Sequence, residues 1–215
     1  MTDARRVLLA GATGLVGGEL LRGLLADDTV AVVHVLTRRA FQVEHPKLKA
    51  QVVDFSALPP LPPLDEAYLA LGTTIKVAGS QAAFRAVDFD ANLAVARAAR
   101  AAGARRLGLV SAMGADQHAR VFYNRVKGEL EEGVKALGFD ALVIARPSLL
   151  LGDRGALGQP TRAGEHIGSL LAGVLRPLIP ARYRPIKAVD VARALLTQVP
   201  AAPGDVVLSS DAMQG

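Results

Sequence analysis

Short apolar runs alternate along the chain with longer segments in which apolar residues recur at helical spacing. The short runs are typical of buried strands and cover residues 7–10, 30–36, 50–55, 67–72, 107–111 and 141–145. Between them, the spacing predicts helices over residues 14–25, 81–102 and 121–137. Strands that alternate with helices in this way favour a parallel sheet. We therefore expect an α/β fold built on one doubly wound parallel sheet with helices on both faces.

The pattern changes after Pro147. Residues 152–168 are rich in glycine and polar residues, which indicates a loop, and further helices are expected near residues 165–175 and 189–198, with a last strand over 205–209. Because the end of the chain is too short for an independent second domain, we expect residues 1–215 to form one domain. Within it, residues from about 151 to 215 would form a small C-terminal cap on the substrate side.

The proline-rich stretch LPPLPP at residues 58–63 falls between the third and fourth predicted strands. Such a segment favours the extended polyproline conformation. We expect it to be a stiff connector that replaces a helix. The alternative is a ligand for an SH3-type partner.

Composition excludes several classes of protein. Hydrophobic residues make up 51% of the chain and charged residues 21%, which excludes a mostly disordered chain. The absence of cysteine excludes a disulfide framework and a thiol nucleophile, and the four histidines lack the spacing of metal ligands. The net charge is +5, but the arginines occur in scattered pairs. We therefore expect no metal and no nucleic acid, and a basic surface that attracts anionic ligands.

No apolar run reaches 18 residues, so no membrane-spanning helix is expected. The first apolar stretch, residues 7–10, is too short for the core of a signal peptide. We therefore expect a cytoplasmic location. A homodimer or a protein partner is left open.

Three glycines form a GxxGxxG motif between the first predicted strand and the first predicted helix: Gly11, Gly14 and Gly17. In such a turn one glycine permits the bend, another lets a pyrophosphate approach the backbone, and a third lets helix and strand pack closely. Backbone N–H groups and the helix dipole then hold the diphosphate. This position favours dinucleotide binding over a purely structural turn.

The second predicted strand is followed by Arg38 and Arg39. A site that prefers NAD usually has an acidic residue here to accept from the ribose 2′-hydroxyl, whereas arginine offers paired donors to a 2′-phosphate. We therefore expect NADP(H), with NAD(H) the weaker alternative. Asp54 ends the third predicted strand and can accept from the adenine amino group, and Gly72 ends the fourth and lets the cofactor pass close.

Tyr123 and Lys127 form a YxxxK motif on a predicted helix, and a spacing of four places both side chains on one face. An ammonium beside a phenol favours the phenolate and readies it for proton transfer. The alternative is a tyrosine packed against the sheet and a lysine in solvent. Ser111, at the end of the fifth predicted strand, adds a hydroxyl.

Together these residues resemble the short-chain dehydrogenase/reductase superfamily in its atypical or extended branch, and above all the Tat-interacting-protein-like oxidoreductases. The resemblance runs from residue 7 to about residue 190. It is carried by Asp54, Asn92 and the motifs GATGLVG (11–17), ALGTT (70–74), SAMGAD (111–116), YNRVK (123–127), VKGELE (126–131) and RPSLLLGDR (146–154). It implies a Rossmann-type fold, NADP(H) binding and an often undefined substrate.

The resemblance also implies a role for each matching position. The cofactor-binding residues would be Gly11, Thr13, Gly14, Leu15, Val16 and Gly17 at the diphosphate, Thr37 and Arg38 at the 2′-phosphate, Asp54 and Phe55 at the adenine, Leu71, Gly72 and Thr73 at the ribose, and Lys127 and Pro147 at the nicotinamide. The catalytic residues would be Tyr123 as proton donor, Lys127, and Ser111 for the substrate carbonyl. Some relatives carry this hydroxyl at the positions that correspond to Ala112 or Met113, so the chain departs from their pattern.

We therefore expect an NADP(H)-dependent oxidoreductase that acts on a small carbonyl or hydroxyl substrate. The alternative is a redox sensor that binds NADPH and a protein partner without turnover, which the departure at the serine position and the small cap favour. A sugar-nucleotide epimerase is a third option, but its substrate domain is normally larger than residues 151–215.

Overall fold

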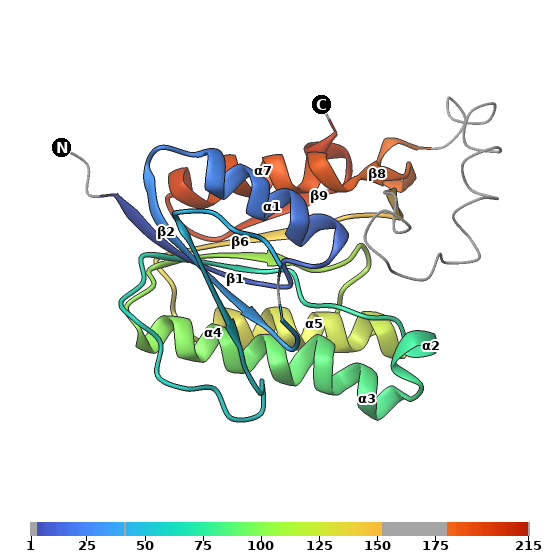
Figure 1. Cartoon of the computed structure of the whole chain (residues 1–215). Helices are drawn as coiled ribbons and strands as arrows, with labels where there is room; N and C mark the ends of the chain where they lie inside the picture. The colour runs from blue at the N-terminus through green and yellow to red at the C-terminus, as the bar shows by residue number, and fades with distance from the viewer. Residues whose placement is uncertain (1–3, 41, 152–179, 215) are drawn as a thin grey trace.

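A computed structural model describes residues 4–40, 42–151 and 180–214. At its centre lies a seven-stranded sheet in the order β3-β2-β1-β4-β5-β6-β9, in which every neighbouring pair is parallel (Figure 1). Its strands are β1 (Arg5–Ala10), β2 (Val30–Thr37), β3 (Leu48–Val52), β4 (Glu66–Leu69), β5 (Arg106–Val110), β6 (Ala141–Arg146) and β9 (Val206–Ser209). A second, two-stranded sheet pairs β7 (Leu150–Leu151) with β8 (Ile186–Lys187).

Helices cover both faces of the large sheet (Figure 1). On one face, α1 (Leu15–Ala26) packs against α7 (Ala188–Ala201); on the other lie α4 (Asn92–Ala101) and α5 (Phe122–Lys135). The shorter helices are α2 (Ile75–Ala78), α3 (Gln81–Arg85), the π-helix η1 (Ala86–Ala91) and the 3-10 helices η4 (Ala181–Tyr183) and η5 (Asp211–Met213). The expected doubly wound, Rossmann-type α/β fold is confirmed.

The apolar run in β1 follows from burial on both faces of the sheet. Val7 and Leu9 belong to the core beneath α1 and α7, whereas Leu8 and Ala10 belong to the core beneath α4 and α5. Successive side chains of a strand point to opposite faces, so a strand with a helical layer on each side must be apolar throughout.

The strands adjoining β1 end level with it. Ala10 pairs with Leu36 of β2 and with Leu69 of β4. The chain order reverses beside β1, between β3-β2 on one side and β4 on the other, and ligands of such sheets bind outside the carboxyl ends at this switch point. The loops that follow Ala10, Thr37 and Leu69 are therefore brought to one edge.

Several predicted boundaries are shifted. β3 and β4 end at Val52 and Leu69, so residues 53–55 and 70–72 lie in the loops at the carboxyl edge. The helix expected over residues 81–102 is divided into α3, η1 and α4. Residues 53–65 contain neither helix nor strand, as expected of a proline-rich connector.

The C-terminal segment contributes to the sheet. β9 pairs with β6, and α7 packs against α1, so both elements complete the layers of the fold. The helix expected near residues 165–175 and most of the remaining cap fall within residues 152–179, outside the described residues.

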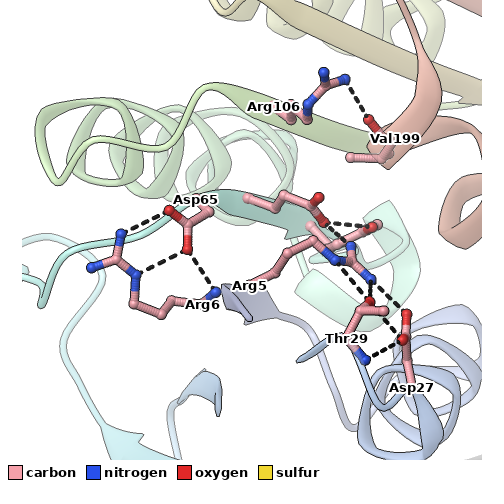
Figure 2. A network of polar contacts seen from close by, with 9 residues as sticks. Arg5, Arg6, Asp27, Thr29, Asp65, Arg106 and Val199 are labelled. Atoms are coloured by element: carbon pink, nitrogen blue, oxygen red, sulfur yellow. Dashed lines mark hydrogen bonds and ion pairs between the residues drawn. The ribbon is translucent and has the colours of Figure 1, made fainter. Parts of the chain in front are cut away.

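Ion pairs join the strands at the amino-terminal edge of the sheet (Figure 2). The guanidinium of Arg5 lies 2.6 Å from Glu66 Oε2 and 2.5 Å from Asp27 Oδ2. Glu66 is buried and also accepts a hydrogen bond from the hydroxyl of Tyr68. Burial raises the pKa of Tyr68 well above its ordinary value, so this phenol stays protonated. These contacts stabilise the edge opposite the ligand-binding one.

Candidate functional site

The turn between β1 and α1 is shaped by close contacts at its first and third glycines. Gly11 has φ 95°, in the left-handed region, and a Cβ there would lie 2.4 Å from the carbonyl oxygen of Ala70. A Cβ on Gly17 would lie 1.9 Å from the carbonyl oxygen of Gly11. Only glycine fits either position without moving the backbone. The turn is therefore held between α1 and the loop that follows β4.

Gly14 is the N-cap of α1 and has no side chain with which to cap the helix. The N–H groups of the first turn of a helix lack partners within that helix, and the helix dipole favours an anion beside them. Val16 is buried in the core and Leu15 is half-buried, so they offer backbone rather than side-chain groups, whereas Thr13 is exposed. This turn fits a diphosphate, because no side chain at the N-cap occupies the N–H groups of the first turn.

The residues expected at the adenosine end lie on loops after β2 and β3. Arg38 is exposed directly beyond Thr37, whose hydroxyl donates to the carbonyl oxygen of Arg39 at 2.9 Å. Asp54 accepts from the backbone N–H and the hydroxyl of Ser56, and these hydrogen bonds lower the pKa of Asp54. Its carboxylate is therefore ionised at neutral pH. Phe55 is half-buried beside the core under α4 and α5.

The loop after β4 lies against a buried ion pair. Lys127 Nζ is 2.7 Å from Asp88 Oδ1, and the two side chains are only 5% and 1% exposed. A Cβ on Gly72 would lie 3.4 Å from that carboxylate oxygen and 3.9 Å from the ammonium. The backbone N–H of Thr73 donates to Asp88 Oδ2 at 2.8 Å. The interpretation in which Lys127 points into solvent is thus excluded.

Tyr123 lies one helical turn before Lys127 on α5. It is half-buried, and its ring packs on Phe84 with a centroid separation of 5.5 Å. The two members of the YxxxK motif thus start from the same helix face, as predicted. The sequence interpretation gave no role to Asp88, the partner of Lys127.

Asn92 supports the segment that carries Asp88. Its side-chain amide donates to the carbonyl oxygens of Leu71, Val87 and Asp88, each at 3.2 Å. Asp88 lies in the π-helix η1, and such wide turns often occur at functional sites. Asn92 Oδ1 is buried and has no hydrogen-bond partner among the described residues. Asp88 and Asn92 are four positions apart and thus on one helix face, which is the signal that could have indicated this pair.

Ser111 lies at the expected edge, directly after β5, but its hydroxyl is engaged. It donates to Glu131 Oε1 at 2.5 Å, and Glu131, 1% exposed, also accepts from Arg146 at 3.0 and 2.5 Å. The Glu131 carboxylate in turn raises the pKa of Arg146. A serine hydroxyl carries one hydrogen, so Ser111 cannot donate to Glu131 and to a substrate at once. Glu131 and Arg146 also line a polar hollow of about 320 Å³.

The segments after β5 and β6 are joined by a hydrogen bond from the N–H of Met113 to the carbonyl oxygen of Pro147, at 2.9 Å. Pro147 is buried, as is Ala112, whereas Met113 is partly exposed. This places Pro147 beside the Ser111 segment.

The contacts form one continuous strip along the carboxyl edge. Gly11 packs against Ala70, and the loop that contains Ala70 continues to Gly72, which lies beside the Asp88–Lys127 pair. Lys127 is on α5, and Tyr123 in the N-terminal turn of the same helix ends the strip. No group of acidic, histidine or cysteine residues in the described ranges is arranged to hold a metal ion. Likewise, none of the helices within residues 4–151 and 180–214 is long and apolar enough to cross a bilayer.

Comparison with known proteins decides the family. The profile of a family described as NAD(P)H-binding matches residues 11–166. The chain is 34% identical over 202 residues to "Protein HTATIP2" from Rattus norvegicus, which covers 91% of this chain and 81% of that protein. It belongs to the NAD(P)H-binding, atypical short-chain dehydrogenase/reductase family. The resemblance inferred from the motifs is confirmed, and the chain is an NAD(P)-binding protein.

A further relative and a solved structure are also similar to this chain. The chain is 38% identical over 179 residues to "Protein fmp52, mitochondrial" from Emericella nidulans, with coverage of 79% of this chain and 75% of that protein. It shares its fold with MoeE5, solved in complex with UDP-glucose and NAD: the TM-score is 0.69 at 18% identity, over 94% of this chain and 75% of MoeE5.

The expectation of a cytoplasmic location is contradicted by these relatives. The proteins from Emericella nidulans, Aspergillus niger and Aspergillus fumigatus are all named mitochondrial. The expectation rested on a search for apolar segments, whereas mitochondrial targeting segments are amphipathic and rich in arginine. A search for apolar segments does not detect segments of that kind.

Proposed function

We propose that this chain is an NADP(H)-dependent oxidoreductase that acts on a small carbonyl or hydroxyl substrate at the carboxyl edge of the sheet. The observation that carries the proposal is the buried ammonium of Lys127, 2.7 Å from Asp88 and one helical turn from Tyr123. A buried ammonium is costly unless it is paired. Held beside a phenol at a dinucleotide site, it supports proton transfer by that phenol.

The cofactor would be held along the strip of contacts described above. The diphosphate would lie on the first turn of α1, at residues 11–17, and Pro147 would border the nicotinamide. Arg38 supports NADP(H), because it is exposed at the end of β2 and its sequence neighbours, Thr37 and Arg39, are not acidic residues that could accept from a ribose 2′-hydroxyl. Asp54 and Phe55 would flank the adenine, and Leu71, Gly72 and Thr73 the ribose. When bound, the nicotinamide supplies or accepts the hydride.

Side chains of this protein would transfer the proton that accompanies the hydride. Tyr123 would donate its hydroxyl proton to the carbonyl oxygen during reduction and take it back during oxidation. Lys127 would stabilise the phenolate left behind, and its remaining N–H groups would bind ribose hydroxyls. Ser111 would steady the carbonyl oxygen once its hydroxyl turns away from Glu131.

A second candidate function, an NADPH-binding sensor without turnover, is favoured by one observation. The hydroxyl of Ser111 is bonded to Glu131, and the next position is held by Ala112, which has no donor. A site that binds NADPH but offers no second donor to a carbonyl would be a poor catalyst.

The two functions are separated by incubating the full chain with NADPH and a panel of aldehydes, ketones and quinones while following the near-ultraviolet absorbance of the reduced nicotinamide. The oxidoreductase predicts a catalytic fall in absorbance with at least one member of the panel. Tight NADPH binding without a fall for any member would refute turnover and favour the sensor. Ser111→Ala, assayed with the best substrate, tests the serine, since loss of a donor to the developing oxyanion costs about 100-fold or more.

A further inference from the structure

We propose that Asp88 is a positioning residue that aims the ammonium of Lys127 toward the nicotinamide half of the dinucleotide. This inference rests on the proposed function, because it assigns Lys127 to that half. The carboxylate of Asp88 is 1% exposed and 2.7 Å from Lys127 Nζ. The motifs that carry the family resemblance do not include Asp88.

The two oxygens of Asp88 have different partners. Oδ1 faces the ammonium on α5, whereas Oδ2 accepts the backbone N–H of Thr73 at 2.8 Å. A backbone donor cannot change rotamer, so this second bond fixes the orientation of the carboxylate. Asp88 therefore ties the position of Lys127 to the loop that passes along the expected path of the cofactor.

The backbone of Asp88 is itself held in place. Asn92 donates to the carbonyl oxygens of Val87 and Asp88 inside the π-helical turn, and to Leu71 at the start of the same loop. In a π turn the backbone hydrogen bonds run from i to i+5 in place of i+4, and a carbonyl oxygen has a second lone pair that can accept from a side chain. The side-chain amide of Asn92 is such an additional donor, and it ties the backbone at Asp88 to the start of α4.

The other acidic residues nearby are committed elsewhere. Glu131, one turn after Lys127 on α5, binds Ser111 and Arg146, and Asp90 in η1 is exposed. Within the part of the chain that the structure describes, Asp88 is the carboxylate within ion-pair distance of Lys127. The 2.7 Å contact is an ion pair without hydrogen-bond geometry, since Asp88 Oδ1 has no hydrogen-bond partner among the described residues. Asp88 therefore fixes the position of the ammonium by charge and leaves its N–H groups for a ligand.

Removing the carboxylate of Asp88 should weaken binding of the nicotinamide half of the cofactor and leave binding of the adenine half unchanged. Without the carboxylate, the Lys127 ammonium loses its partner and its direction, so contacts to the nicotinamide ribose weaken. The adenine half would be held by the first turn of α1 and by Arg38, neither of which touches Asp88. The loss should therefore appear with a whole dinucleotide and be absent with its adenine half.

The test compares Asp88→Asn with Asp90→Asn, a matched control that makes the same charge change two residues away on an exposed side chain. Calorimetric titration of the full chain uses two probes, NADPH and adenosine 2′,5′-bisphosphate. For Asp88→Asn we expect the Kd of NADPH to rise about tenfold or more, the size of one charge-assisted hydrogen bond, and that of the bisphosphate to change by less than about twofold. Asp90→Asn should change neither.

Equal weakening of both probes, or no change in either, would overturn the inference. If Asp88→Asn gives no cooperative unfolding transition, Lys127→Met is compared with the double variant Asp88→Asn/Lys127→Met, in which neither charge is left unpaired. Equal NADPH affinity of these two proteins supports the inference, and a further loss in the double variant overturns it. Failure of the wild-type chain to bind NADPH is a different result, which refutes the proposed function.

Discussion

Gly17 lies directly against Gly11, so closely that a Cβ on Gly17 would be 1.9 Å from the carbonyl oxygen of Gly11. The N–H of Gly14 donates to that same oxygen at 2.9 Å. The contact seats the start of α1 on the end of β1, and a Cβ on Gly11 would in turn strike Ala70 after β4. The diphosphate-binding turn is therefore a packed structure whose shape depends on missing side chains.

Replacing Gly17 with alanine should disrupt this turn. The added methyl group has no space, so the start of α1 must move, which should lower the free energy of unfolding by about 1–3 kcal/mol and raise the Kd of NADPH about tenfold or more. Gly18→Ala is the matched control, since a Cβ there would meet its nearest atom, the oxygen of Ala12, at an ordinary 3.6 Å. Calorimetry and denaturant unfolding measure both quantities; unchanged NADPH binding by Gly17→Ala would contradict the assignment.

Arg38→Ala should weaken NADPH selectively. If Arg38 binds the 2′-phosphate, its loss removes a charge-assisted hydrogen bond, and the Kd of NADPH should rise about 10–100-fold while that of NADH stays nearly constant. Arg39→Ala removes the neighbouring exposed arginine and should have a much smaller effect. Parallel titrations with the two cofactors decide the matter, and equal losses for both would show that Arg38 does not read the phosphate.

Much of this architecture could be predicted from the sequence. The continuous apolar run of residues 7–10 indicated a strand covered on both faces, and the three glycines after it indicated the turn. The YxxxK spacing placed Tyr123 and Lys127 on one helix face. These features are local, since strand burial, turn geometry and helix period are set by residues close together in the chain.

The partners of the buried charges could not be predicted in this way. Asp88 reaches Lys127 across 39 positions of the sequence, and Glu131 reaches Ser111 and Arg146 on two different strand ends. Such pairings depend on how α5 packs against η1 and against the ends of β5 and β6, which no local pattern specifies. The π turn in η1 could not be predicted either, because its residues match those of a regular helix in composition.

Removing the guanidinium of Arg5 should destabilise the chain without affecting the cofactor site. Arg5→Met leaves the buried carboxylate of Glu66 without its cation, which should cost about 3–5 kcal/mol of unfolding free energy. Arg105→Met breaks an exposed pair with Asp140 and should cost about 1 kcal/mol or less. Urea unfolding compares the two variants. Similar small losses in both would show that Glu66 does not depend on Arg5.

Asp65 should contribute a small pH dependence to stability. Hydrogen bonds from Arg6 hold the pKa of Asp65 below its ordinary value of 3.8, so the folded chain binds this proton less readily than the unfolded chain. The stabilisation is therefore present above pH 3.8 and is lost as the pH falls through the lower, folded value. Because the side chain is 39% exposed, the effect should be about 1 kcal/mol or less. Unfolding curves from neutral to acidic pH should be flatter for Asp65→Asn than for wild type; parallel curves would contradict the linkage.

The central claim is that Tyr123 transfers the proton, and the most direct measurement is the rate of NADPH oxidation by Tyr123→Phe with the fastest carbonyl substrate found. The account predicts that the rate falls by about 100-fold or more while NADPH affinity is retained. The phenyl ring keeps its packing on Phe84 but has no hydroxyl proton to donate. Tyr183→Phe removes the hydroxyl of an exposed tyrosine to which the account gives no catalytic role, and it should match wild type. Wild-type turnover by Tyr123→Phe would contradict the account.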